Sequence, residues 1–346
     1  MTSRVRIEDV AEAAGVSMKT VSRVLNREPN VREDTRAQVM RAVDRLKYIP
    51  NHSARSLAGN KSYLIALIYN NPSANYLMEV MGGVLEGCQA QRYNMLLCPL
   101  EPDGPKLLAG VEAVIARSRP DGLILTPPIT DSPSLLKRLA ELDIPFASIS
   151  PKVQKRGVCV AMDETQAAFD MVVHLASLGH KRIAHIVGPP AHGASAWRLT
   201  GYKQGLEHAG LKLDPSLVVQ GEFTFDSGMH GAERLLALKR PPSAVFAAND
   251  DMAAGVIRVA LDRQMRVPED ISICGFDDTP LSLNIFPPLT TVHQPTHEMG
   301  RLATLALLNE VQNPGSGGLL RVPYTLQMRR STGPAPKRSI PALRES

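Results

Sequence analysis

The chain has 346 residues, a formal net charge of +5 and 44% hydrophobic residues. This length suffices for two or three domains, and so large an apolar fraction excludes a wholly disordered protein. The positive excess lies at the start: residues 1–60 hold 11 Lys and Arg against 7 Asp and Glu, while the other 286 residues carry a net charge of only +1. A small basic module at one end favours nucleic acid as a partner, although a solvated charged surface would have the same composition.

Secreted, membrane and metal-binding proteins are not indicated. The first residues contain no apolar run typical of a secretory signal, and no stretch is apolar enough over sufficient length to span a membrane, so we expect a cytoplasmic protein. The cysteines form no CxxC pair and have no histidine at a metal-ligand spacing, so we expect reduced, buried thiols and neither a metal site nor a cofactor. They are Cys88, Cys98, Cys159 and Cys274.

The first 47 residues predict three short helices. Apolar residues recur at helical spacing from residue 7 to residue 14, and Gly15 then permits the chain to reverse. Ser17 can cap a second helix, and a third ends before Pro50. Their inward faces are formed by Ile7, Val10, Ala11 and Ala14, by Val21, Val24 and Leu25, and by Val39, Val43 and Leu46. Two short helices around a tight turn describe a helix-turn-helix.

The rest of the chain predicts a short helix and then an α/β fold. The helix, at residues 51–58, has only about two turns and is marginal on its own. From residue 63 short apolar runs alternate with helical stretches, which predicts two linked parallel sheets covered by helices on both faces. A final helix is expected near 296–311, a strand at 321–324 and a flexible tail from Gly333. The other predicted strands are 64–69, 95–97, 122–125, 145–149, 158–162, 183–187, 217–219, 244–247 and 271–275.

The second helix carries side chains suited to reading DNA. Lys19 and Arg23 are four residues apart and so project from one face, with Met18 beside them. Lysine and arginine suit the acceptor edge of guanine in the major groove, and methionine can contact a thymine methyl group. Short polar side chains nearby suit phosphate contacts. The residues in this second group are Ser17, Thr20, Ser22 and Asn26.

Residues 9–26 closely resemble the helix-turn-helix signature of the LacI/GalR family of bacterial repressors, and the resemblance continues along almost the whole chain. It implies that Met18, Lys19 and Arg23 read base edges. Residues 51–59 resemble the family's hinge helix, in which Leu57 enters the minor groove as an apolar wedge. The other hinge residues expected at the DNA are Asn51, Ala54 and Arg55. The alternative is an ordinary linker, with Leu57 docked on the core.

The resemblance also implies the domain organisation. We expect a helix-turn-helix domain at residues 1–50, a hinge helix at 51–60, and an effector-binding core at 61–332 with the periplasmic-binding-protein-like fold. Its first lobe would comprise about 61–162 and 293–323, and its second about 163–292 and 324–332, with the tail at 333–346. The two lobes of this fold close around a small molecule.

The same resemblance places effector contacts in the cleft. Arg198 and Asp277 would clamp the ligand, Asn249 would lie beside them, and Phe223 would stack on a ring. Arginine, asparagine, aspartate and an aromatic face together suit a sugar. The alternative for Arg198 and Asp277 is a structural ion pair. The first lobe would add Asn75, Tyr76 and Ser150, the last standing where many members carry an aspartate. A glucoside or other saccharide is expected rather than a nucleobase.

These patterns predict a ligand-responsive regulator. We expect a homodimer on a palindromic DNA operator, because a single helix-turn-helix reads one half-site and no leucine heptads follow residue 333. A saccharide in the core would change operator affinity through the hinge, and the regulated genes would be those of sugar uptake and catabolism in the bacterial cytoplasm, on the nucleoid. An enzyme is not expected, because nucleotide-binding loops and nucleophile motifs are absent. A secreted solute-binding protein would share the core but not the DNA module.

Overall fold

The computed structural model describes residues 5–25, 29–48, 61–102, 104–152 and 157–337. The predicted DNA contacts Asn26, Asn51, Ala54, Arg55 and Leu57 lie outside these described residues. The chain divides into two compact units, residues 1–63 and residues 64–346, each considered by itself below.

The first unit is a bundle of helices α1 (Ile7–Ala13), α2 (Met18–Leu25) and α3 (Glu33–Leu46), as predicted. Helix α1 begins where the Arg6 amide donates to Asp9 at 2.7 Å. Gly15 has a φ of +58° in the turn before α2, which confirms the need for a permissive residue there. The buried residues form one core, so the polar face of α2 is left at the surface. They are Val10, Ala11, Ala14, Val21, Val24, Val39, Ala42 and Tyr48.

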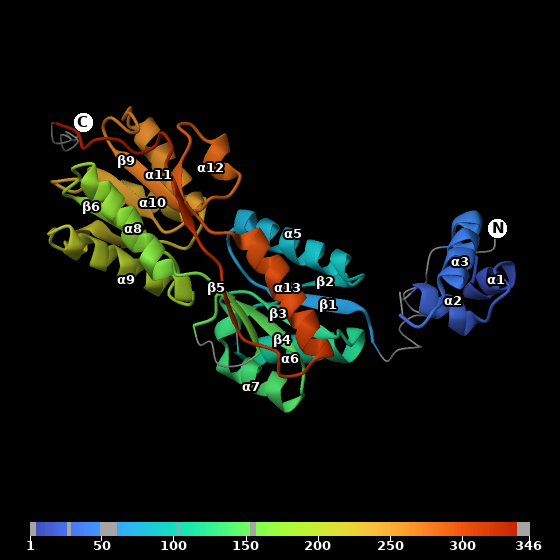
Figure 1. Ribbon diagram of the computed structural model, residues 1–346. Helices are drawn as coiled ribbons and strands as arrows, with labels where there is room; N and C mark the ends of the chain where they lie inside the picture. Colours follow the sequence, from blue (N-terminus) through green and yellow to red (C-terminus); the bar gives the residue numbers. More distant parts are fainter. Residues whose placement is uncertain (1–4, 26–28, 49–60, 103, 153–156, 338–346) are drawn as a thin grey trace. The chain divides into compact units, whose positions relative to one another are not determined.

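The second unit contains two six-stranded sheets (Figure 1). The first has the order β11-β5-β4-β3-β1-β2 and is parallel throughout. The second has the order β12-β10-β9-β8-β6-β7 and is parallel except for the pair β10 and β12. The strands are β1 (Leu64–Tyr69), β2 (Asn94–Pro99), β3 (Gly122–Leu125), β4 (Phe146–Ile149), β5 (Val158–Ala161), β6 (Ile183–Val187), β7 (Val218–Gln220), β8 (Ala244–Ala247), β9 (Ser272–Asp277), β10 (Thr290–His293), β11 (Leu319–Arg321) and β12 (Thr325–Gln327).

Helices cover both faces of each sheet, and we call each sheet with its helices a lobe. In lobe 1, helices α6 (Gly104–Ser118) and α7 (Pro133–Glu141) pack on one face, while α13 (Thr296–Gln312) packs on the other beside α5 (Ala74–Ala90). Gly83 lets these last two helices approach closely, because a Cβ there would lie 1.8 Å from the His297 carbonyl oxygen. The two sheet faces are therefore both buried, which explains the continuous apolar runs of the strands.

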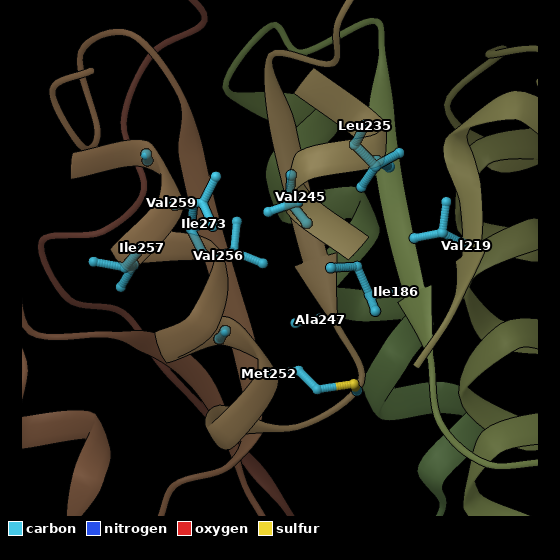
Figure 2. Close-up of a cluster of buried hydrophobic side chains, with 14 of the residues drawn as sticks. Ile186, Val219, Leu235, Val245, Ala247, Met252, Val256, Ile257, Val259 and Ile273 are labelled. Carbon is cyan, nitrogen blue, oxygen red and sulfur yellow. The ribbon is translucent and has the colours of Figure 1, made fainter. Parts of the chain in front are cut away.

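Lobe 2 is built in the same way around the second sheet. Helices α8 (Glu164–Ser177) and α9 (Gly193–His208) cover one face, and α10 (Phe225–Leu236) and α11 (Asp250–Asp262) cover the other. Figure 2 shows the core under α10 and α11, where Ile186, Val245 and Ile273 of the sheet meet Leu235 and Val256 of the helices. The short helix α12 (Leu281–Asn284) follows β9. These layers hold the carboxyl ends of the strands at one edge of the sheet.

The end of the chain differs from the prediction in two places. The single strand expected at 321–324 is two strands, β11 in lobe 1 and β12 in lobe 2, and Pro323 lies between them, where it cannot donate to a ladder. The segment from Gly333, expected to be a flexible tail, is hydrogen-bonded to lobe 2 over its first residues. The Gly333 amide donates to Ser272 Oγ at 3.0 Å, and the Ala335 amide donates to the Leu178 carbonyl at 2.9 Å. Ordered contacts therefore continue past residue 332.

Candidate functional site

A cavity of about 370 Å³, measured to its open mouth, lies at the carboxyl ends of the strands of both lobes. This is where parallel α/β sheets bind their ligands, because the loops that follow the strands converge there. The residues that line it are Asn71, Ser73, Tyr76, Pro127, Ser150, Glu164, His192, Ala194, Arg198, Phe223, Asn249, Asp277 and Gln294.

Arg198 of α9 is the centre of a buried polar network, with only 3% of its surface exposed. Its Nε donates to Glu164 Oε2 at 2.9 Å, and its Nη2 donates to Gln294 Oε1 at 3.1 Å and to Asp277 Oδ1 at 3.4 Å. Its Nη1 donates to the carbonyl of Ala248. The guanidinium carbon lies 3.6 Å from the centroid of the Phe276 ring. Arg198 is thus held rigidly by both charge and stacking.

Arg198 and Asp277 form the ion pair that the sequence left open as the alternative to ligand contact, and Asp277 is the more distant of the two carboxylates around the guanidinium. Burial raises the pKa of Asp277 to about 7, although the Arg198 charge opposes that shift. The backbone of Asp277 has a φ of +106°, and the site residues Phe223 and Ser150 also have positive φ values, of 60° and 48°. Backbone strain of this kind collects at ligand sites.

Asn249 lines the cavity, but both ends of its side-chain amide already form hydrogen bonds with the protein. Its Oδ1 accepts from the Met252 amide at 3.0 Å and so caps α11. Its Nδ2 donates to the Phe223 carbonyl at 3.0 Å. Asn249 therefore fixes the strained backbone that presents the Phe223 ring to the cavity.

Of the three residues of lobe 1 predicted to contact an effector, two line the cavity. Ser150 Oγ is buried and has no hydrogen-bond partner among the described residues. Tyr76 lines the cavity, and burial, aided by Glu164 and Asp277, raises the pKa of its hydroxyl, which keeps the group neutral. Asn75 does not line the cavity, contrary to the prediction; its Nδ2 donates to Asp251 Oδ1 at 2.7 Å instead.

Asp251 belongs to lobe 2, so this contact joins the two lobes. Its second oxygen, Oδ2, accepts from Ser73 Oγ at 2.5 Å. A further bridge runs from Lys152 Nζ of lobe 1 to the Ala191 carbonyl of lobe 2, at 3.1 Å. The two lobes are therefore fastened to each other beside the cavity.

Five polar residues that line the cavity were not predicted from the sequence: Asn71, Ser73, Glu164, His192 and Gln294. Glu164 and Gln294 flank Arg198, and His192 packs edge-on against the Phe223 ring with its centroid 5.4 Å away. Burial lowers the pKa of His192 to about 4, so this imidazole is neutral. The sequence could have indicated two of them, because Gln294 directly follows β10 and Glu164 begins α8 three residues after β5, at the carboxyl ends of strands where ligands bind.

The candidate DNA surface lies on α2 in the first unit. Met18, Lys19 and Arg23 are exposed, whereas Val21 and Val24 on the opposite face are buried. Ser17 Oγ accepts from the Thr20 amide at 3.2 Å, as the predicted cap should, and lies 2.9 Å from the Thr20 hydroxyl. The helix thus presents its three predicted base-reading side chains to solvent.

The described part of the chain shows neither a metal-binding cluster nor a membrane-spanning helix. No group of three or more His, Cys, Asp and Glu side chains there is arranged to hold a metal ion. None of the described helices is long and apolar enough to cross a membrane.

Comparison with known proteins identifies both units. Residues 6–51 match the family of bacterial regulatory proteins of the lacI type, and residues 172–332 match the periplasmic binding protein-like domain. The HTH-type transcriptional regulator DegA of Bacillus subtilis (strain 168) is 36% identical over 333 residues, which are 95% of this chain and 98% of that protein. The chain belongs to the LacI family. The ribose operon repressor of Escherichia coli (strain K12) is 34% identical, covering 89% of this chain and 93% of that repressor.

Solved structures of LacI-family members share the fold. The Lac repressor dimer bound to operator and the anti-inducer ONPF aligns with a TM-score of 0.79 at 29% identity, over 96% of this chain and all of that one. The complex of the transcriptional regulator CelR with cellobiose aligns with a TM-score of 0.71 at 30% identity, over 95% and 100%. The predicted fold class is confirmed. The chain is a DNA-binding transcriptional regulator with an effector-binding domain, and its relatives are regulators rather than enzymes, as expected.

Proposed function

We propose that this regulator is a repressor that binds a palindromic operator as a homodimer and that a small saccharide in the cavity changes its affinity for the operator. The cavity carries the proposal: it lies where α/β sheets bind ligands, and Arg198, Phe223, Asn249 and Asp277 all line it. The regulated genes are then those of sugar uptake and catabolism, and the protein acts in the bacterial cytoplasm, on the nucleoid.

The chemistry of the cavity supports a saccharide. Asp277 and Ser150 Oγ, which has no partner among the described residues, can hydrogen-bond to the hydroxyl groups of a ligand, and the Phe223 ring offers a flat apolar face to a sugar ring. Relatives point the same way, since CelR is found with cellobiose and a LacI-family regulator of Enterococcus faecium with ribose. The second of these is 25% identical with a TM-score of 0.71, over 78% of this chain and 99% of that one.

The DNA contacts follow from the exposed face of α2. Met18, Lys19 and Arg23 read base edges in a major groove, and each protomer supplies one such helix to one half-site. Contacts to the DNA backbone come from Ser17, Thr20, Ser22 and Asn26. The hinge contacts Asn51, Ala54, Arg55 and Leu57, with Leu57 as the minor-groove wedge, complete the proposed interface.

The test combines ligand screening with operator binding. The full chain is melted with cellobiose, ribose, glucose and adenosine, and an operator is selected from randomised duplex DNA. We expect a saccharide to raise the melting temperature and to change operator affinity, because binding to the folded state stabilises it by mass action. Arg23→Ala is the matched control: it should weaken operator binding while leaving the thermal shift intact. Stabilisation by adenosine with no response to any saccharide would contradict the proposal.

A further inference from the structure

The charge of the cavity limits the ligands that it accepts. We propose that it takes an uncharged, hydroxyl-rich ligand and rejects the phosphorylated or carboxylated forms of the same molecule, because Arg198 is already matched by the carboxylates of Glu164 and Asp277. The inference rests on the proposed function, that a small effector binds in this cavity. It refines that function by naming the charge class of the effector.

The charged side chains that line the cavity have no net positive charge. Among the described residues that line the cavity, the arginine and the two carboxylates have side chains at most 6% exposed. One guanidinium between two carboxylates leaves a formal charge of −1, or zero if one carboxyl is protonated. The lining side chains His192 and Tyr76 add no charge, since burial holds both in their neutral forms. An anion would therefore meet a cavity with no net positive charge.

Protein acceptors already use most of the N–H donors of the Arg198 guanidinium. Arginine has five N–H donors, and four hydrogen bonds to protein acceptors already use this group in Arg198. The Phe276 ring covers one of its faces at 3.6 Å. A phosphate or carboxylate usually binds arginine through two parallel N–H donors. These four bonds leave Arg198 one N–H for a ligand, on Nη1, so such a fork must displace at least one of the four protein acceptors.

Other groups near the cavity that could attract an anion are partly neutralised by the protein itself. The ammonium of Lys152, beside the cavity, already donates to the Ala191 carbonyl at 3.1 Å and lies 4.0 Å from Asp131. Helix N-termini also attract anions. However, α8 begins with Glu164 at the cavity, and α11 carries Asp250 and Asp251 in its first turn. These carboxylates occupy the positive ends of α8 and α11. Helices α5 and α9, which also begin at the cavity, have no acidic residue in their first turns, so the rejection of anions rests on the charge balance and on the occupancy of Arg198.

The walls of the cavity are rich in hydrogen-bond acceptors. Glu164, Asp277 and the amide oxygen of Gln294 line the walls and already accept from Arg198, but their oxygens can accept further hydrogen bonds from donors on a ligand. Hydroxyl groups both donate and accept, whereas phosphate and carboxylate oxygens at neutral pH mainly accept. The Ser150 hydroxyl, which has no partner among the described residues, can then pair with either role of a ligand hydroxyl.

The test uses neutral molecules and their charged derivatives with the full wild-type chain. Glucose is compared with glucose 6-phosphate and glucuronate, ribose with ribose 5-phosphate, cellobiose with cellobionate, and adenosine with its monophosphate, by isothermal titration. We expect at least one neutral molecule to bind, and to bind about 100-fold more tightly than its anionic derivative, since like charges placed together are strongly unfavourable. An anionic derivative that binds as tightly as its neutral parent, or binding by no neutral molecule, would overturn the inference.

Two variants locate the cause of the discrimination. Glu164→Gln and Asp277→Asn each remove one carboxylate charge with little change in shape, so we expect the preference for the neutral ligand to fall at least tenfold in either one. Glu207→Gln, on the exposed part of α9, is the control and should leave the preference unchanged. A thermal melt checks that each variant is folded. If adenosine is the neutral ligand that binds, the saccharide proposal fails while the charge inference stands; a preference unchanged in both folded variants overturns the inference.

Discussion

Asp251 of α11 accepts a hydrogen bond from Ser73, the N-cap of α5, with the two oxygens 2.5 Å apart across the cleft. Asn75, the second residue of the same helix, donates to the other carboxylate oxygen at 2.7 Å. These two bonds join lobe 2 to lobe 1 without passing through a ligand. They favour the closed arrangement of the lobes, in which the residues of the cavity are brought together.

Removal of this link should weaken effector binding. Asp251→Ala abolishes both hydrogen bonds, so the open arrangement becomes more populated and the apparent affinity falls with the closed fraction. A hydrogen bond to a charged group contributes about 1.5–3 kcal/mol, so we expect the dissociation constant of the bound saccharide to rise about tenfold or more. Isothermal titration measures it. Asp262→Ala, at the exposed end of the same helix, should leave the constant unchanged; equal effects of the two variants would contradict the role of Asp251.

Arg198→Met should destabilise the core and abolish the effector response. Methionine fills similar space beside Phe276, but Glu164 and Asp277 lose their buried cation. Breaking a buried pair in this way costs about 3–5 kcal/mol of unfolding free energy, which urea denaturation measures. The deficit should shrink at low pH, where protonation removes the unpaired charges. A variant with wild-type stability at pH 8 would mean that the network does not hold lobe 2 together.

The sequence predicted the strands well for a physical reason. Both sheets are covered on two faces, so their strands are nearly continuous apolar runs, and β1, β3, β6 and β8 have the predicted bounds. The helical period likewise predicted which face of α2 is exposed and which is buried. The boundary between β11 and β12 could not be predicted, because the residues on both sides of Pro323 have strand propensity. Only the tertiary structure assigns them to different sheets.

The site was less predictable than the strands. Arg198, Asn249 and Asp277 were found through a family resemblance, but that resemblance did not reveal that protein acceptors already occupy Arg198 and that Asn249 caps α11. Asn75 was predicted to line the cavity together with its neighbour Tyr76. Its partner, Asp251, is 176 residues away, and no local pattern indicates a contact at that separation.

The pH dependence of stability should carry a contribution from Asp277. Burial raises its pKa to about 7, above the value of about 3.9 expected in the unfolded chain. The folded state therefore binds more protons between these values, so this residue contributes stability that is complete below about pH 4 and is lost as the pH rises through 7. We expect the unfolding free energy of the wild type, relative to Asp277→Asn, to fall between pH 4 and pH 7. Urea melts at several pH values measure the difference, and a difference that stays constant would contradict the raised pKa.

Arg23 should specify one base pair of the operator. Its side chain is exposed on the polar face of α2, in the last turn, four residues after Lys19. If it donates to the edge of a guanine, Arg23→Ala should cost about 1–3 kcal/mol of binding free energy and relax the preference at that position alone. Fluorescence anisotropy with single-substitution operators measures this. Arg41→Ala, on the exposed face of α3, is the matched control and should leave the base preference at every position unchanged. An Arg23→Ala variant that lost affinity equally for all operator sequences would place Arg23 on the phosphate backbone instead.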